Sequence, residues 1–369
     1  MLGVLAIGTE TGAAFAPSIP AALLPVGEGS AVDRAIDAMI AVGVDEIHVD
    51  PADHELSVRV HERYPSVPIV QDDDLTGALV RHDRVLWMPA TAVVDHSSLE
   101  RLATAGAGVL KRPSEPFSPL AGPEPRPICL PADVFEDRAP SDAPAIARGL
   151  DVDGALERIE CDHVADVRRP WELLDANEWY IAGVDTPDGH SIDGVRSRSD
   201  GEIHPDADLT GPVAVHQGAR IGPGVVIEGP VVVSPGADVG PNCYVRSNTF
   251  IGEDVHIGAS VEIKNSVLLD GAKVPHLSYV GDSVVGPDAN VGAGSLVANL
   301  RHDDQPVRLT HNDCRVSTGR RKFGVVIGEG SKLGIGTRLN VGTVLGVGAT
   351  TTPGEIVVRD VRTEGDTER

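Results

Sequence analysis

Two cationic side chains and one imidazole occupy positions where they could bind a phosphate and move a proton. Arg246 and Lys264 stand 18 residues apart in a region whose sequence repeats every six residues. Eighteen residues make one full coil of three hexads, so the two side chains should stack on one face. Two stacked cations in an acidic chain suit a phosphate monoester. His276 follows where the repeat is interrupted, and an imidazole titrates near neutral pH.

The six-residue repeat predicts the scaffold that carries these side chains. An aliphatic residue recurs at every sixth position from Ile203 to Leu269, and the pattern resumes at Val285 and again at Ile327. Glycine often follows the aliphatic residue. A period of six fits neither an α-helix nor a two-sided strand, but it fits short strands and tight turns wound around a prism. The hexapeptide repeat therefore predicts a parallel β-helix.

We expect two interruptions of this repeat, at 273–281 and from about 299 to 326. Interruptions of a rigid solenoid are places where chemistry can be mounted. The first contains KVPHLSYVGDS, with His276 and Tyr279. The second contains a cationic cluster that is unusual in so acidic a chain, made of Arg315, Arg320, Arg321 and Lys322.

The N-terminal half predicts an α/β domain of Rossmann-like type, because apolar strands alternate with helical periodicity. The expected strands are 2–7, 44–50, 85–88 and 107–110, and the expected helices include 30–42 and an amphipathic connecting helix at 169–180. The predicted organisation is an α/β domain over 1–182, a linker over 183–200, the β-helix over 201–362, and a disordered tail over 363–369.

Composition narrows the possible partners and the compartment. The net charge is −24, with 55 acidic residues against 31 basic ones. Few of the basic residues are lysine, which favours a protein adapted to a salty, halophilic cytosol. So acidic a chain is not expected to bind nucleic acid. The four cysteines are scattered, which argues against disulfides and a metal site. No apolar run reaches the length of a membrane span, and the start lacks signal-peptide features, so we expect a cytoplasmic protein.

The segment IKNSVLLDGAKVPHLSYVGDSVVGPDANVGAGSLVANLRHDD, residues 263–304, resembles a known family. The family comprises the archaeal bifunctional sugar-1-phosphate nucleotidylyltransferase/acetyltransferases. The resemblance continues through VSTGRRK and IGEG and covers about 200–360. It implies a left-handed β-helix that forms a homotrimer. It also implies acetylation of glucosamine-1-phosphate by acetyl-CoA, a reaction that needs no metal.

The resemblance also implies a role for individual residues. His276 falls at the general base that would take a proton from the sugar amine, and its residue type suits that task. The backbone N–H of Ala293 matches an oxyanion donor. The positions that hold the sugar phosphate are Arg246 and Lys264, and the substrate-positioning residues are Tyr279, Asn290 and Asn299.

Structural alternatives remain for most of these residues. Without the motif, Arg246 and Lys264 would be ordinary exposed charges, Tyr279 could pack at the interruption, and the two asparagines could sit at corners. The cationic cluster could contact the phosphates of CoA, bind an anion at a trimer interface, or form salt bridges with nearby carboxylates. The remaining histidines of the β-helix are interpreted as surface residues, namely His204, His216 and His256.

One departure from the family concerns the acceptor site. Six residues after Asn299 the family usually carries a lysine, and here Gln305 occupies that position. Arg308 lies three residues further on and could supply the charge. We expect the change to weaken substrate binding rather than abolish the chemistry.

The N-terminal half matches the family more loosely, through PAALLPVG, GVDEI and RRPWELLDANEW. Gly12 stands where the family's catalytic arginine is expected, Ala21 where its lysine is expected, and Thr91 where its metal-binding aspartate is expected. Phosphoryl transfer depends on Mg²⁺ and cations to offset developing charge. The three replacements predict a degenerate domain that has lost nucleotidylyltransferase activity.

The sequence thus predicts an acetyl-CoA-dependent N-acetyltransferase of a hexosamine-1-phosphate, with glucosamine-1-phosphate as the first candidate. One alternative is a sugar-1-phosphate nucleotidylyltransferase or a bifunctional enzyme. Another is a non-catalytic partner of an active paralogue. A β-helical carbonic anhydrase is disfavoured, because no two histidines have the five-residue spacing of its zinc ligands.

Overall fold

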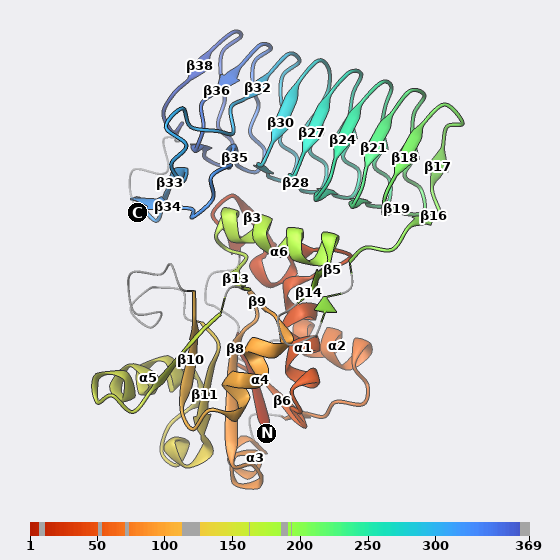
Figure 1. Cartoon of the computed structure of the whole chain (residues 1–369). Helices are drawn as coiled ribbons and strands as arrows, with labels where there is room; N and C mark the ends of the chain where they lie inside the picture. The colour runs from red at the N-terminus through yellow and green to blue at the C-terminus, as the bar shows by residue number, and fades with distance from the viewer. Residues whose placement is uncertain are drawn as a thin grey trace.

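The computed structural model describes residues 1–6, 12–50, 54–70, 74–112, 126–161, 163–185, 191–192 and 194–361. An α/β part and a β-helical part follow one another along the chain (Figure 1). The predicted disordered tail, 363–369, lies outside the described residues. Within the described residues, no helix combines the length and apolarity needed to cross a membrane.

The α/β part is built on a seven-stranded sheet of order β12-β10-β11-β8-β1-β6-β7. Neighbouring strands are parallel except for β11, which is antiparallel to β8 and β10. The strands are β1 (Leu2–Ala6), β6 (Glu46–Asp50), β7 (Ile69–Val70), β8 (Arg84–Pro89), β10 (Gly108–Lys111), β11 (Ile128–Pro131) and β12 (Glu157–Glu160). The strands predicted from hydrophobic runs correspond to β1, β6, β8 and β10, and the Rossmann-like prediction is confirmed.

Six α-helices are assigned within the described residues, and apolar clusters pack on both faces of the sheet. They are α1 (Ala31–Ala41), α2 (His54–Arg63), α3 (Leu75–Arg81), α4 (His96–Thr104), α5 (Ala143–Val152) and α6 (Pro170–Ala182). Both predicted helices are present, as α1 and α6. Proline at the first position of α6 suits a helix start, and Gly183 ends the helix with a φ of 78°.

Short elements complete this part of the chain. The strands are β2 (Gly12–Ala13), β3 (Ala16–Pro20), β4 (Pro25–Val26), β5 (Gly29–Ser30), β9 (Ala92–Val94), β13 (Val164–Asp166), β14 (Val184–Asp185) and β15 (Ser191–Ile192). The 3₁₀ helices are η1 (Ala21–Leu23), η3 (Ala132–Phe135) and η4 (Pro140–Asp142).

The β-helix has three parallel sheets, which confirms the fold predicted from the hexads. The sheet nearest the α/β part, here the interface sheet, contains β16 (Arg198–Ser199), β19 (Val213–Val215), β22 (Val231–Val233), β25 (Thr249–Ile251), β28 (Val267–Leu268), β31 (Val284–Val285), β35 (Val325–Ile327) and β37 (Thr343–Leu345). The short sheet contains β17 (Glu202–Ile203), β20 (Arg220–Ile221), β23 (Asp238–Val239), β26 (His256–Ile257) and β29 (Lys273–Val274). The outer sheet, whose arrows stand side by side in Figure 1, contains β18 (Asp208–Thr210), β21 (Val226–Glu228), β24 (Tyr244–Arg246), β27 (Glu262–Lys264), β30 (Tyr279–Gly281), β32 (Leu296–Val297), β36 (Arg338–Leu339) and β38 (Ile356–Val357).

The first predicted interruption of the repeat, 273–281, is wrong. Strands β29 and β30 pass through it without a break. The corner after Lys264 is one residue shorter than the corner before it, so Ile251 pairs with Leu268 rather than with Leu269. Leu268 therefore fills the axial core, whereas Leu269 packs outside it. A change of phase was mistaken for a gap, because a period-six search loses the pattern when one residue is missing.

The second predicted interruption is present between Val297 and Val325. It contains the antiparallel hairpin of β33 (Arg308–His311) and β34 (Cys314–Ser317). The His311 ring meets Trp171 of α6 edge to face, with ring centroids 5.3 Å apart. The segment between Val297 and Val325, here the excursion, thus contacts the α/β part.

The two parts share one apolar cluster. Side chains on the outward face of the interface sheet, among them Phe250, Val267 and Val284, are buried with Phe15 and Trp171 of the α/β part. Helix α6 lies along this sheet, between the two parts (Figure 1). Burial of apolar surface is the main favourable term in such packing. The α/β part therefore packs on the interface sheet and not on the outer sheet.

Candidate functional site

The two predicted phosphate-binding cations do stack. Arg246 and Lys264 end the adjacent strands β24 and β27 and are direct partners in the register. Each is paired with a carboxylate. Arg246 Nη1 donates to Glu262 at 3.1 Å, and this hydrogen bond raises the pKa of Arg246. Lys264 Nζ lies 3.0 and 2.9 Å from the two carboxylate oxygens of Asp282. A phosphate would therefore meet cations that are already oriented.

Asp282 connects the predicted site residues at this corner. It is only 1% exposed and has a φ of 52°. Besides Lys264, its carboxylate accepts hydrogen bonds from Asn265 at 2.9 Å and from Asn299 at 2.5 Å. A buried carboxylate is stable as an ion only when it is paired and hydrogen-bonded, and all these contacts meet that need. Sequence reasoning missed Asp282, because an aspartate at a corner is ordinary in so acidic a chain.

Tyr279 crosses the outer sheet. It begins β30, and its hydroxyl accepts a hydrogen bond from Asn299 Nδ2 at 3.0 Å. A β-carbon placed on Gly281 would lie 2.3 Å from that hydroxyl, so the ring passes over the glycine. Partial burial, together with the nearby Asp282 carboxylate, raises the pKa of Tyr279. The side chain thus links the start of β30 to the Asp282 corner.

His276 lies at the opposite edge of the outer sheet, in the exposed corner that precedes β30. Its Nδ1 accepts a long hydrogen bond of 3.3 Å from the backbone N–H of Ala259. In this arrangement the neutral ring carries its proton on Nε2. For Nε2 to act as a base, this contact must break and the proton must move to Nδ1.

The predicted oxyanion donor lies beside His276. Ala293 occupies the same corner of the next coil, and the adjacent Gly294 N–H donates to the His276 carbonyl at 2.8 Å. Asn290 lies just before this corner, in a bridge that continues the short sheet between Lys273 and Lys332. His276 and Ala293 therefore lie at the edge where the chain enters the outer sheet, and Asn290 lies before it on the short sheet.

Within one chain, the predicted site residues form two groups. His276 and Ala293 lie at the entry edge of the outer sheet, and Lys264 and Asn299 lie at its exit edge. A three-residue strand separates the groups, about 10 Å at ~3.3 Å per residue. Arg246 shortens this gap, because its guanidinium reaches back to Glu262, the first residue of β27. The predicted residues therefore frame one face rather than meet at one point.

Arg320 of the cationic cluster is tied to α6. It forms ion pairs with Asp175 and Glu178, both very short, and its side chain is 13% exposed. Burial opposes the charge, but attraction to Glu178 outweighs it and raises the pKa of Arg320. Of the three interpretations of the cationic cluster, salt bridges with nearby carboxylates fit Arg320.

The rest of the cluster is near the surface. Arg321 pairs with Asp304 at 2.7 Å, in an exposed salt bridge, and Lys322 is exposed. Arg315 donates to the backbone carbonyl of Arg308 at 2.6 Å, and Arg308 donates to the carbonyl of Arg315 at 2.8 Å. Arg308, which could replace the charge missing at Gln305, is thus engaged in its own hairpin.

Gly12, Ala21 and Thr91 occupy the positions where the resemblance implies catalytic groups. The structure places all three in ordinary packing or backbone contacts. Ala21 is 4% exposed within the shared apolar cluster. The Thr91 carbonyl accepts the N–H of Val167 at 3.1 Å. Gly12 pairs with Pro20 in the β2–β3 ribbon, and the loop before it lies outside the described residues. Within the described residues, no three His, Cys, Asp or Glu side chains are close enough together to hold a metal ion.

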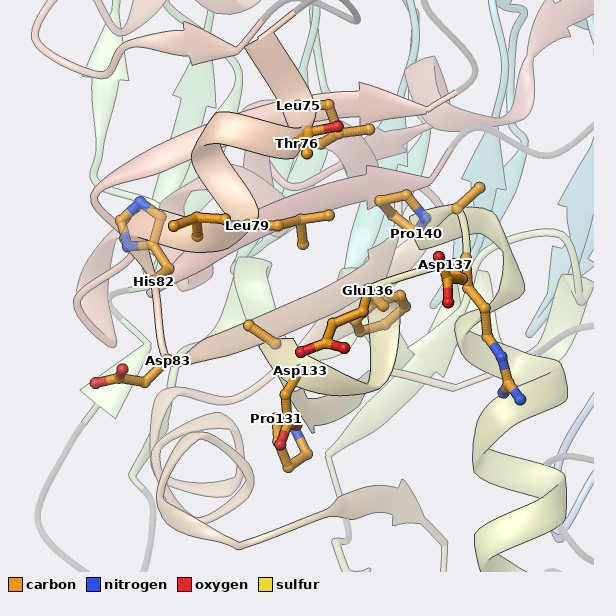
Figure 2. Close-up of a pocket in the computed structure, with 15 residues that line it drawn as sticks. Leu75, Thr76, Leu79, His82, Asp83, Pro131, Asp133, Glu136, Asp137 and Pro140 are labelled. Atoms are coloured by element: carbon orange, nitrogen blue, oxygen red, sulfur yellow. The ribbon is translucent and has the colours of Figure 1, made fainter.

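A cavity of about 750 Å³ lies in the α/β part, between α3 and the segment after β11 (Figure 2). Its lining includes Asp83, Asp133, Glu136 and Asp137. Asp83 directly precedes β8, so the cavity lies at the amino ends of the parallel strands. Ligands of open α/β sheets bind at the carboxyl ends. Both its position and its acidic lining make this cavity unsuitable for a nucleotide.

Comparison with known proteins gives a family model and several relatives. Residues 227–362 match a family model described as the GMPPB C-terminal domain. A bifunctional sugar-1-phosphate nucleotidylyltransferase/acetyltransferase of Sulfurisphaera tokodaii is 41% identical over 196 residues, 53% of this chain and 46% of that protein. The bifunctional protein GlmU of Methanococcus maripaludis is 45% identical over 206 residues, 54% of this chain and 47% of that protein.

The predicted resemblance is confirmed by these relatives, and the chain spans about half of their length. Among solved structures, a nucleotidyl transferase from Methanothermobacter is 20% identical, with a TM-score of 0.33, over 47% of this chain and 89% of that one. The name of the Sulfurisphaera tokodaii relative denotes both nucleotidyl transfer and acetyl transfer, and the Methanococcus maripaludis relative is named as bifunctional.

Proposed function

We propose that this chain is an acetyl-CoA-dependent N-acetyltransferase that acts on a hexosamine-1-phosphate, with glucosamine-1-phosphate as the first candidate. The observation that carries the proposal is the arrangement of the outer sheet. His276 and Ala293 lie at one edge, and the stacked pair of Arg246 and Lys264 lies at the other. A substrate with an amine beside a phosphorylated carbon needs a base and a phosphate site on one face.

The chemistry then follows from the residue types. The sugar amine attacks the thioester carbonyl of acetyl-CoA, and His276 accepts the proton that the amine loses. The backbone N–H of Ala293 donates to the oxyanion of the tetrahedral intermediate. Collapse of the intermediate forms the amide and breaks the carbon–sulfur bond, and the departing thiolate takes up a proton. Arg246 and Lys264 hold the phosphate throughout, with Tyr279, Asn290 and Asn299 positioning the sugar.

The site is proposed to be completed by neighbouring subunits of a homotrimer. Large apolar side chains are exposed beside the His276 corner and along the end of the outer sheet, including Leu277 at 68%, Ile335 at 64% and Ile356 at 62%. Leu277 also has a φ of 52°, which is uncommon for leucine. A second copy of the chain would bury this surface and enclose the space between the two groups of site residues.

The α/β part is proposed to have lost nucleotidylyltransferase activity, because Gly12, Ala21 and Thr91 replace the catalytic arginine, lysine and aspartate implied by the resemblance. A bifunctional enzyme is the second candidate, and the names of the relatives favour it. Incubation with UTP or dTTP, Mg²⁺ and a sugar-1-phosphate separates the two. Substantial release of pyrophosphate would contradict the proposed loss.

The acetyl-transfer proposal is tested by thiol release from acetyl-CoA in the presence of glucosamine-1-phosphate, in molar KCl. Replacing His276 by alanine should reduce kcat by about 10²- to 10⁴-fold. His204→Ala is the matched control, since His204 is exposed beside Asp206 in the first coil of the β-helix, away from the proposed site. Equal rates in wild type and His276→Ala would overturn the proposal and favour a non-catalytic partner of an active paralogue.

A further inference from the structure

We propose that Glu178 of α6 is a positioning residue for the acceptor site, acting through Asn265 and Asp282 on the Lys264 ammonium group. This inference rests on the proposed function. It assigns the α/β part a role in acetyl transfer: it supplies the carboxylate that orients one corner of the outer sheet.

The connection runs through a single amide group. Asn265 Nδ2 donates to Glu178 Oε1 at 2.8 Å and to Asp282 Oδ1 at 2.9 Å. Its two N–H bonds therefore hold one carboxylate from each part of the molecule. Asp282 in turn contacts Lys264 with both oxygens.

The orientation of this amide is determined by the two carboxylates. Asn265 Oδ1 is buried and has no hydrogen-bond partner. Flipping the amide would give Oδ1 no hydrogen-bond donor and would place it between two negatively charged carboxylates. The backbone is also constrained, because Asn265 has a φ of 45°, in the left-handed region that asparagine tolerates. Asn265 is thus a rigid spacer between Glu178 and Asp282.

Glu178 is itself anchored in the α/β part. Arg320 bridges Glu178 and Asp175 of α6. Asp175 also pairs with Arg112, which follows β10, at 2.8 Å. The ion pairs are largely buried, so solvent screens them weakly. The position of Glu178 is therefore set by the α/β part and by the excursion that carries Arg320.

A shift of Asp282 would reach several proposed substrate contacts at once. Its carboxylate holds Lys264 and Asn299, and Asn299 holds the Tyr279 hydroxyl. Loss of the contact from Glu178 should therefore disturb binding of the sugar phosphate. It should leave binding of acetyl-CoA and proton transfer by His276 much less affected, because His276 lies at the other edge of the sheet.

The kinetic test compares Glu178→Ala with wild type. The KM for glucosamine-1-phosphate should rise on the order of tenfold, the value of one lost hydrogen bond to a charged group, while the KM for acetyl-CoA stays unchanged. Glu178→Gln keeps an oxygen acceptor for Asn265 and should show a smaller rise. Glu100→Ala removes an exposed acid from α4 and serves as the matched control.

A second readout does not depend on activity. The chain has five lysines, at positions 111, 264, 273, 322 and 332. Brief treatment with an amine-acylating reagent, followed by peptide mass spectrometry, reports the accessibility of each. In Glu178→Ala, labelling of Lys264 should rise several-fold relative to the exposed Lys273 and Lys332, because the Asp282 carboxylate no longer shields it as tightly.

Asn265→Ala covers the case in which Glu178→Ala does not fold, since it removes the spacer and leaves the ion pair with Arg320 in place. It should give the same rise in KM and in Lys264 labelling. Unchanged KM and unchanged labelling in a folded Glu178→Ala or Asn265→Ala protein would overturn the inference. If wild type transfers no acetyl group but Lys264 labelling responds to Glu178→Ala, the connection stands and the proposed function fails.

Discussion

The Tyr279 hydroxyl lies over Gly281, 2.3 Å from the place that a β-carbon on that glycine would take. The glycine is not needed for its backbone conformation, since its φ is not positive. It is needed for space, because any larger residue would push the ring away from Asn299. The position of the tyrosine therefore depends on the absence of a side chain at Gly281.

Gly281→Ala should displace Tyr279 and break its hydrogen bond with Asn299. We expect the free energy of unfolding to fall by about 1–3 kcal/mol and kcat/KM for the sugar phosphate to fall about tenfold. Urea denaturation and steady-state kinetics measure the two effects. Gly149→Ala is the control, because a β-carbon there meets nothing within 4 Å, and it should be neutral or slightly stabilising. Wild-type kinetics in Gly281→Ala would contradict the role given to Tyr279.

Asp282→Asn should leave the Lys264 ammonium group half-buried without its counterion. Removing one partner of a fully buried pair costs about 3–5 kcal/mol, and Lys264 is 19% exposed, so we expect a loss of about 2 kcal/mol. Equilibrium unfolding in urea provides the value. Lys264→Met added to Asp282→Asn should recover part of the loss, and a double variant less stable than Asp282→Asn alone would argue against this ion pair as the cause.

The stability of the α/β part should depend on pH through Glu172. Burial alone would raise its pKa, but attraction to Arg126, Arg112 and Arg169 outweighs burial and holds the pKa well below the ordinary value of 4.5. The unfolded chain therefore binds a proton near pH 4.5 that the folded chain does not. The contribution of ionised Glu172 to the free energy of unfolding is complete above this pH. It decreases as the pH falls toward the pKa of Glu172 in the folded state.

Comparison of wild type with Glu172→Gln tests this linkage. Glu172→Gln should be less stable by about 3–5 kcal/mol at pH 7, because Arg126 at 2.9 Å loses its buried counterion. The difference should shrink by about 1 kcal/mol at pH 4. Urea midpoints at the two pH values provide the measurement, and a difference that does not change with pH would exclude Glu172 as the titrating group.

Leu277→Asp should dissociate the proposed homotrimer. The side chain is 68% exposed in the single chain, and burial of a leucine contributes about 1.5–3 kcal/mol, which a buried aspartate would reverse. Light scattering coupled to size exclusion gives the mass. Val152→Asp, at an 87% exposed position on α5, is the control and should leave the mass unchanged. A wild-type protein that runs as a monomer would contradict the proposed assembly.

Potassium chloride should stabilise the protein. The net charge of −24 implies repulsion within the folded chain, and the Debye length shortens from about 10 Å at 0.1 M to about 3 Å at 1 M. The Tm should therefore rise between these concentrations. Sucrose at matched osmolality separates screening from solute exclusion, and an equal rise in both solutes would argue against charge repulsion.

Much of the fold follows from local patterns in the sequence. The axial core could be predicted because a residue such as Ile227 or Val245 is apolar at a strict period and becomes fully buried. The shift at Leu268 could not, because one missing residue at a corner changes the phase without changing the composition. The packing of the hairpin of β33 and β34 could not be predicted for a different reason: its partners include β37 and Trp171, and Trp171 is more than a hundred residues away.

The site was predictable where the residue type and the coil spacing determine position. The stacking of Arg246 and Lys264 is one example. Asp282 and Glu178 were not predictable, since an aspartate at a corner and a glutamate on a helix are ordinary on an acidic surface. Their roles depend on which carboxylates meet Asn265, and that depends on how α6 packs on the interface sheet.

The apolar flank shared by Phe250, Val267 and Val284 also bears on how this protein can be altered. A truncated protein that contains only the β-helix would expose this apolar surface to solvent. We expect such a protein to aggregate. This packing would favour retention of the α/β part even without a catalytic role.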